Sequence, residues 1–249
     1  MNDVMKQLTQ HKSIRKYEDK PIPEEVLQAI FQATRQAPSW INGQQVSIIR
    51  VTDPNQRAAL KQLAGNQAYV ETAAEFLVFC LDFYRASKVA ELEGKPFAVT
   101  ENIDLLLIGA NDVGIAIGTA VIAAESFGLG TVAIGGVRRD PQAVIDLLEL
   151  PSFVYPVSGL CIGYPAEAPD LKPRLPQQAV IFENKYEHDL TKEIATYNET
   201  FSSYMQKRTN GDSNANWSGS VSNFYSQPQY VNNQYAKAEP ILKKQGFLK

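Results

Sequence analysis

The chain has few of the side chains that build metal centres or disulfide frameworks. Its 249 residues include two cysteines and two histidines. Cys80 (FLVFC) and Cys161 (GLCIG) lie inside apolar, strand-like runs and no C-x-x-C spacing occurs, so we expect two buried thiols rather than ligands or a disulfide. His11 and His188 are too few and too scattered for a zinc site. The sequence therefore predicts no metal centre.

The chain also lacks an excess of positive charge and a targeting signal. It carries 24 Lys and Arg against 27 Asp and Glu, a net charge of −3. A nucleic-acid binder usually carries a basic stripe, so nucleic acid is not expected as a partner.

The start, MNDVMKQLTQ, has no apolar signal-peptide core, so a cytoplasmic setting is expected. The apolar stretch 103–129 contains Asp104, Asp112 and Glu125, which would be costly in lipid, so no membrane span is expected.

Three common catalytic and binding motifs are missing. Neither G-x-G-x-x-G nor G-x-x-x-x-G-K-[ST] occurs, so a Rossmann or P-loop nucleotide site has no support from the sequence. There is no G-x-S-x-G, and no candidate Ser or Cys nucleophile is paired with a suitable base. Hydrolase chemistry is therefore disfavoured.

The order of the predicted elements indicates an α+β or mixed α/β layered fold. Periodicity predicts helices over 2–10, 24–37, 54–63, 141–149, 189–207 and 237–248, and strands over 45–52, 76–82, 131–134 and 155–162.

The stretch 103–129 is apolar almost all round and predicts a buried helix about 40 Å long. Gly109, Gly114 and Gly118 would let another backbone approach it, from a neighbouring helix or from a second copy in a two-fold dimer. Residues 209–229 are rich in Asn, Ser, Gly and Gln and are expected to form a mobile surface segment or lid.

Several residues could converge on one phosphate-bearing, ring-containing ligand. The cluster HKSIRKY at 11–17 and the pair Lys172 and Arg174 could neutralise a phosphate. Gly135-Gly136 would let backbone N–H groups approach a planar ring, because no Cβ intervenes. The alternatives are a solvated turn for each cationic stretch and an ordinary turn for the glycine pair. On these residues alone, both interpretations stay open.

Five sequence blocks that occur together and in order resemble the nitroreductase superfamily, specifically its NADPH-dependent nitro/flavin reductase branch. They are HKSIRKY at 11–17, APSWINGQQ at 37–45, GNQAYV at 65–70, AAESFGLGTVAIGGVR at 123–138 and GLCIGYP at 159–165, and DLKPRLP at 170–176 closes the set. The resemblance runs from about residue 1 to residue 208 and continues more loosely to the end.

The resemblance implies a homodimer with one FMN per active site between the subunits. The implied fold is α+β, a mixed sheet flanked by helices with a long central helix. Residues 1–208 would form the FMN-binding domain. Residues 209–249 would be a C-terminal extension of the same domain, with a mobile loop at the coenzyme site.

The resemblance also implies which residues bind FMN. His11 and Ser13 would hold the phosphate and ribityl chain, and Arg15 would lie near the N1/O2 edge of the flavin. Lys12 is a further implied FMN-binding position, at which the family often has arginine. The other implied FMN-binding positions are Ser39, Trp40, Ile41, Asn42, Gln67, Ile134, Gly135, Gly136, Lys172 and Arg174. The family's serine-rich run is replaced here by Ser-Trp-Ile-Asn.

Coenzyme choice is expected to depend on the segment after the 189–207 helix. Lys207 and Arg208 match one position that grips the NADPH 2′-phosphate, and Ser213 stands where a second arginine often lies. NADPH is therefore expected as the donor, with NADH competing.

The implied activity is that of an FMN-containing NAD(P)H oxidoreductase with a ping-pong hydride-transfer cycle. Free flavin, nitroaromatics or quinones would be the acceptors, and no protein side chain need act as nucleophile. The alternative is an FMN-binding protein that stores or senses flavin without turnover.

Overall fold

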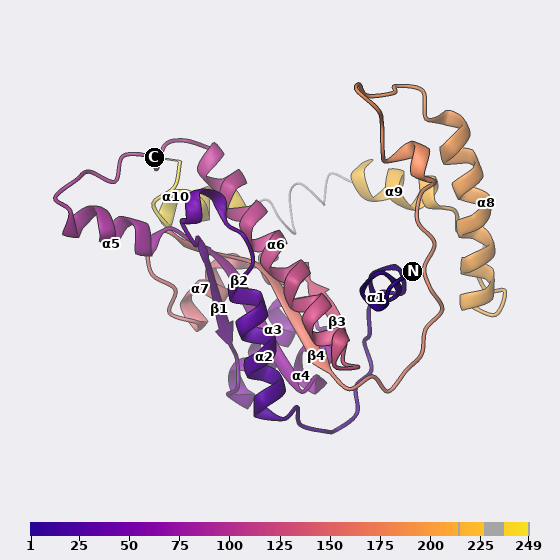
Figure 1. Ribbon diagram of the computed structural model, residues 1–249, viewed down its shortest axis with the longest axis horizontal. Helices are drawn as coiled ribbons and strands as arrows, with labels where there is room; N and C mark the ends of the chain where they lie inside the picture. The colour runs from indigo at the N-terminus through magenta and orange to yellow at the C-terminus, as the bar shows by residue number, and fades with distance from the viewer. Residues whose placement is uncertain (214, 227–236, 249) are drawn as a thin grey trace. The chain divides into compact units, whose positions relative to one another are not determined.

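A four-stranded antiparallel sheet in the order β1–β2–β4–β3 organises most of the chain (Figure 1). Its strands are β1 (Val46–Arg50), β2 (Glu75–Asp82), β3 (Gly130–Ile134) and β4 (Val154–Gly163). The computed structural model describes residues 1–213, 215–226 and 237–248. Among these, the parallel pairing expected of a mixed sheet is limited to one isolated bridge, Ser13–Thr131. The predicted α+β class is confirmed.

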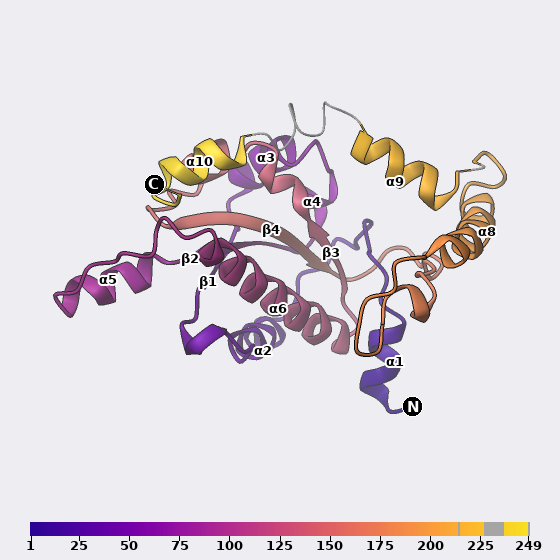
Figure 2. The same ribbon diagram turned by 90° about the horizontal axis from the view of Figure 1, so that it is seen from above.

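Helices cover both faces of this sheet. Figure 2 shows α2 and α6 on one face and α3, α4 and α10 on the other. All eight residues of β2 are buried as a result, which explains the continuous apolar run in its sequence. The helices of this part are α1 (Asp3–Thr9), α2 (Glu24–Arg35), α3 (Pro54–Leu63), α4 (Tyr69–Thr72), α5 (Tyr84–Leu92), α6 (Asp104–Ser126), α7 (Pro141–Leu147) and α10 (Ala238–Lys244).

Local signals explain where two of these helices begin. The Asp53 side chain accepts a hydrogen bond from the Gln56 N–H at 2.8 Å, and Pro54 occupies the first turn of α3. Asp140 and Pro141 repeat the arrangement at the start of α7. An acidic cap followed by proline supplies an acceptor and a preset φ where helical N–H groups lack partners.

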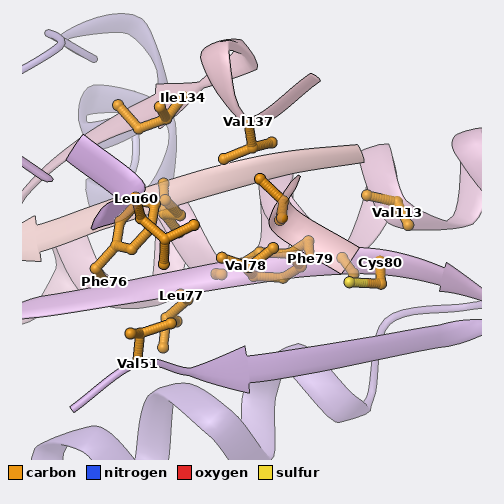
Figure 3. Close-up of a cluster of buried hydrophobic side chains, with 14 of the residues drawn as sticks. Val51, Leu60, Phe76, Leu77, Val78, Phe79, Cys80, Val113, Ile134 and Val137 are labelled. Atoms are coloured by element: carbon orange, nitrogen blue, oxygen red, sulfur yellow. The ribbon is translucent and has the colours of Figure 1, made fainter. Parts of the chain in front are cut away.

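The core lies between the sheet and its helices. Figure 3 shows Phe76 and Phe79 of β2 together with Leu60 of α3 and Ile134 of β3, all at most 1% exposed. Cys80 lies in the same cluster. Both cysteines are buried and free, as predicted. Burial raises the pKa of both thiols, that of Cys80 to about 12.

The central helix α6 buries only one side in the single chain. Its inward positions include Gly109, where a Cβ would lie 2.9 Å from Leu81 Cβ. On the outer side, a Cβ at Gly114 or Gly118 would meet nothing within 4 Å, and Leu107 is 64% exposed. The helix predicted to be buried is therefore only partly buried in the single chain, and its outer side is left for the second copy that the sequence also allows. By length and composition α6 could cross a membrane, a test that a core helix packed on a sheet also passes.

Residues Pro169–Asn232 form a second compact unit, and Met1–Ala168 with Asn233–Lys249 form the first. The second unit contains the short 3-10 helix η3 (Gln177–Ala179), α8 (Thr191–Arg208) and α9 (Trp217–Ser226). The predicted boundary after residue 208 falls inside this unit and stays a prediction.

A helix, α9, forms within the stretch 209–229, where the composition indicates none. Asn198 of α8 exchanges two hydrogen bonds with Ser218, and the Trp217 ring packs edge-on against Tyr197 at 5.5 Å. Residues 214 and 227–229 of the predicted mobile segment lie outside the described residues.

Candidate functional site

The N-terminal cationic segment is bound to the edge strand β3. The Ile14 N–H donates to the Thr131 carbonyl at 2.9 Å, and Ser13 forms the bridge to the same residue. Gly130 makes this approach possible, because a Cβ there would lie 2.6 Å from Ile14 Cγ1. The segment HKSIRKY is therefore an ordered part of the sheet edge rather than a solvated turn.

His11 is held by an acidic residue from the end of α6. Its Nδ1 lies 2.6 Å from Glu125 Oε1, and the Thr131 hydroxyl donates to the same oxygen at 3.3 Å. Glu125 was not among the residues predicted from the sequence. In the sequence it is a charge inside an apolar run and part of the block at 123–138, and neither feature identified its partner.

A second carboxylate supports the segment from the other side. Glu167 Oε1 accepts the backbone N–H of Arg15 at 2.6 Å and that of Lys16 at 3.1 Å. The Arg15 side chain is exposed, and its guanidinium donates to the Ser13 carbonyl at 3.4 Å. Lys12 is half-buried. Glu167 thus fixes the backbone of this segment and Glu125 fixes its histidine ring, while the Arg15 side chain stays exposed.

The other end of β3 carries the glycine pair. Ile134 is the last residue of the strand, and Gly135 and Gly136 begin the 3-10 helix η2 (Gly135–Arg138). A Cβ at Gly136 would collide with the carbonyl oxygen of Ala64, whereas at Gly135 the nearest heavy atom would be 3.9 Å away. Gly136 therefore permits close packing, and Gly135 borders open space.

The contact between Gly136 and Ala64 brings the turn that contains Gln67 beside the glycine pair. Gly65 and Asn66 both have positive φ, +90° and 58°, which turns the chain after α3. The side-chain oxygen Oε1 of Gln67 is buried and has no hydrogen-bond partner among the described residues. A buried acceptor without a donor is rare in folded proteins and requires an explanation.

The loop at 39–42 has a strained backbone. Trp40, Ile41 and Asn42 form the 3-10 helix η1 (Trp40–Asn42), in which Ile41 has φ 49°, and a left-handed conformation is uncommon for a β-branched residue. The Trp40 and Ile41 side chains are 53% and 76% exposed. Backbone strain of this kind clusters at functional sites.

This loop borders two cavities. Ser39 and Asn42 line a cavity of about 650 Å³ that is also lined by residues of α2, β1 and α6. Trp40 and Ile41 line a smaller, mostly apolar cavity of about 300 Å³. None of the other predicted site residues lines either cavity. Within the first unit, β3 thus carries the His11–Arg15 segment at its start and Ile134–Gly136 at its end, with the turn that contains Gln67 beside Gly136. The 39–42 loop borders the two cavities instead.

The remaining predicted residues belong to the second unit. Arg174 donates to the Lys172 carbonyl at 2.8 Å, and the Lys172 ammonium lies 5.6 Å from the centre of the Phe201 ring. Tyr197 donates to the Pro173 carbonyl at 2.8 Å, which ties the segment around Lys172 and Arg174 to α8. Lys207 is paired with Asp170 at 2.8 Å, and Arg208 is exposed.

These features describe an α+β protein whose cationic sheet-edge segment, glycine turn and unsatisfied amide oxygen suit a flat ligand with a phosphate. Residues 8–164 match the nitroreductase family, and residues 172–249 match the nitroreductase family C-terminal domain. The chain belongs to the nitroreductase family.

Relatives resemble the chain over most of its length. An FMN reductase [NAD(P)H] of Bacillus subtilis (strain 168) is 47% identical over 99% of this chain and 98% of its own. An oxygen-insensitive NADPH nitroreductase of Salmonella typhimurium is 40% identical over 89% and 90%. The structure of an NADPH:FMN oxidoreductase from Vibrio harveyi complexed with NAD+ has a TM-score of 0.89 and 38% identity, and covers 100% of both chains.

Proposed function

We propose that this chain is an FMN-dependent NAD(P)H oxidoreductase that reduces free flavin, nitroaromatics or quinones. The single observation that carries the proposal is the arrangement at β3, where the cationic segment is bound at one end and the glycine pair, beside Gln67, at the other. Relatives named FMN reductase, NADPH-flavin oxidoreductase and nitroreductase support this activity.

The residues present fit FMN. The buried Gln67 Oε1 needs a donor, and the flavin ring offers an N–H. The open space beside Gly135 leaves its backbone accessible to a flat ring. His11 and Ser13 would contact the phosphate and ribityl chain, with Lys172 and Arg174 as further phosphate-binding cations. Lys12, Ile134 and Gly136 would complete this set.

When bound, FMN supplies the redox chemistry: it takes electrons from the nicotinamide coenzyme and passes them to the acceptor. The chain's own contribution is binding and electrostatics. The Arg15 guanidinium is permanently charged and would stabilise negative charge at the N1/O2 edge of the ring. The backbone at Gly135 and Gly136 would contact the ring without a side chain to block its faces.

The active form in this proposal is a cytoplasmic homodimer. The outer side of α6 carries exposed apolar residues such as Leu107, and Val4 and Met5 of α1 are also exposed and apolar. Burying such surface stabilises an assembly by about 25 cal/mol per Å². A partner would also explain how Ser39, Trp40, Ile41 and Asn42 reach a flavin, because the residues of a shared site come from two chains.

NADPH is the proposed electron donor, and NADH competes with it. Arg208 is exposed at the end of α8 and would meet the 2′-phosphate. The Lys207 ammonium is already paired with Asp170, so it can bind the 2′-phosphate only by giving up the Asp170 carboxylate. With Ser213 in place of a second arginine, discrimination between the coenzymes should be modest.

A visible absorption spectrum of the purified protein tests the proposal. We expect a yellow flavin spectrum that bleaches without oxygen when NADPH is added, and more slowly with NADH. Re-oxidation by added flavin, a nitroaromatic or a quinone would then identify the acceptor class. A flavin spectrum that neither coenzyme bleaches would favour storage of FMN, and a colourless protein that takes up no FMN would contradict the proposal.

A further inference from the structure

We infer that Glu125 is a positioning residue that holds the His11 imidazole with Nδ1 turned inward, so that Nε2 is presented to the FMN phosphate. This inference rests on the proposed function, because it assigns a role to His11 in the FMN site. Glu125 is not one of the FMN-binding positions that the family resemblance implies.

The geometry of the pair supports a fixed ring. Nδ1 of His11 lies 2.6 Å from Glu125 Oε1, and the two side chains are 34% and 14% exposed. A short contact between an imidazole nitrogen and a carboxylate assigns the Nδ1 hydrogen to the side that faces Glu125. Only Nε2 then remains to contact a ligand.

The carboxylate itself is held by a rigid element. The Thr131 hydroxyl donates to the same Glu125 oxygen at 3.3 Å, and Thr131 is fully buried in β3. Thr131 also accepts the Ile14 N–H through its carbonyl. One strand residue thus fixes both the backbone of the cationic segment and the acid that orients its histidine.

Helix stability does not explain an acidic residue at this position. Glu125 is in the last turn of α6, Asp104–Ser126, where the helix dipole disfavours negative charge. Its neighbours in space are the His11 ring and the Thr131 hydroxyl. An arrangement in which an acid orients a histidine that in turn contacts a ligand explains both the location and the partner.

The alternative is that Glu125 only fastens the N-terminal segment to α6. The two roles differ in their dependence on the ligand's phosphate. A positioning role affects only ligands that carry the phosphate, whereas a fastening role affects flavin binding in general. Riboflavin has the same ring as FMN and no phosphate, so it separates the two.

The first experiment measures dissociation constants for FMN and riboflavin by flavin fluorescence quenching, with wild type and Glu125→Gln. Glutamine keeps the size of the side chain but removes its negative charge, and because its amide can donate as well as accept, it no longer dictates which ring nitrogen of His11 carries the hydrogen. We expect FMN binding to weaken by about tenfold or more and riboflavin binding to change by less than about twofold. Glu93→Gln, at an exposed acid beyond α5, is the matched control and should alter neither constant.

Equal weakening of both flavins, or no change in either, would overturn the positioning role while leaving the proposed function intact. If wild type itself bound neither FMN nor riboflavin, the proposed function would fail and this inference with it. The two failures are therefore distinguishable.

A second measurement keeps Glu125 unchanged, so it does not depend on whether a Glu125 variant folds. The chain contains only two histidines, so nitrogen NMR of the ring atoms can be assigned with a single His188→Gln variant. We expect His11 to carry hydrogen on Nδ1 and its Nε2 signal to shift when FMN is added, but not riboflavin. An Nδ1 without hydrogen, or an Nε2 signal that FMN leaves unchanged, would overturn the inference.

Discussion

The backbone N–H of Trp40 donates to both carboxylate oxygens of Asp112, at 3.3 Å to Oδ1 and 3.2 Å to Oδ2. Asp112 is only 1% exposed and lies in the middle of α6. It therefore fastens the strained loop that carries Ile41, at φ 49°, to the central helix. The loop conformation depends on a residue 72 positions away.

Asp112→Ala should loosen the 39–42 loop. The change leaves the Trp40 N–H without its acceptor, so we expect the free energy of unfolding to fall by about 1–2 kcal/mol and FMN to bind more weakly. Asp112→Asn keeps a side-chain oxygen at the same place and should lose less of both. Urea unfolding and flavin fluorescence measure the two effects. Equal losses in the two variants would show that the acceptor oxygen is not what holds the loop.

Arg15→Ala should slow flavin reduction more than it alters folding. The Arg15 side chain is exposed, so the free energy of unfolding should change by no more than about 0.5 kcal/mol. Loss of a charge-assisted contact to the flavin costs about 1.5–3 kcal/mol, or roughly tenfold to a hundredfold in rate. Stopped-flow bleaching of the flavin by NADPH gives the rate. Lys16→Ala, an exposed neighbour, is the control, and normal turnover in Arg15→Ala would disprove the assigned role.

Arg208→Ala should raise the KM for NADPH and leave the KM for NADH almost unchanged. Only NADPH carries the 2′-phosphate, and one lost contact to it corresponds to roughly a tenfold increase or more. Steady-state kinetics with each coenzyme measure the ratio. Lys192→Ala removes an exposed cation at the opposite end of α8 and should affect neither KM. An equal effect on both coenzymes would place Arg208 outside the 2′-phosphate site.

The folded protein should lose stability as the pH rises above about 9. Burial raises the pKa of Cys80 from 9.0 to about 12 and that of Tyr155 from 10.0 to about 12. The unfolded chain therefore releases these protons at lower pH than the folded chain, which favours unfolding by up to about 1.36 kcal/mol per pH unit for each group. The contribution of Cys80 and Tyr155 to the stability of the folded state is complete below about pH 9 and is lost as the pH approaches 12.

Urea unfolding between about pH 8 and 11 tests this dependence. In Cys80→Ala the free energy of unfolding should fall less steeply with rising pH than in wild type, although the small cavity left by the substitution makes the variant less stable at neutral pH. Thiol reagents should modify neither cysteine in the folded protein near pH 8 and both after denaturation. A pH-independent free energy of unfolding over this range would contradict the assigned burial effect.

The sequence alone predicted much of the secondary structure. The helix over 54–63 begins and ends where the structure places α3, because Asp53 and Pro54 are local signals. The buried strand over 76–82 was likewise evident from its uninterrupted apolar run, within one residue of β2. Both signals act through neighbours in the chain. The family was also evident from the sequence, because its motifs are short, ordered blocks.

Tertiary structure alone decided how those blocks are held. His11 and Glu125 are 114 positions apart, and their pairing depends on where β3 places the N-terminal segment relative to the end of α6. The helix α9 has a weak local signal and is stabilised by Asn198 and Tyr197 of α8. Local propensity fixes which residues form a helix or a strand, whereas contacts between distant residues depend on packing geometry, which no short stretch of sequence contains.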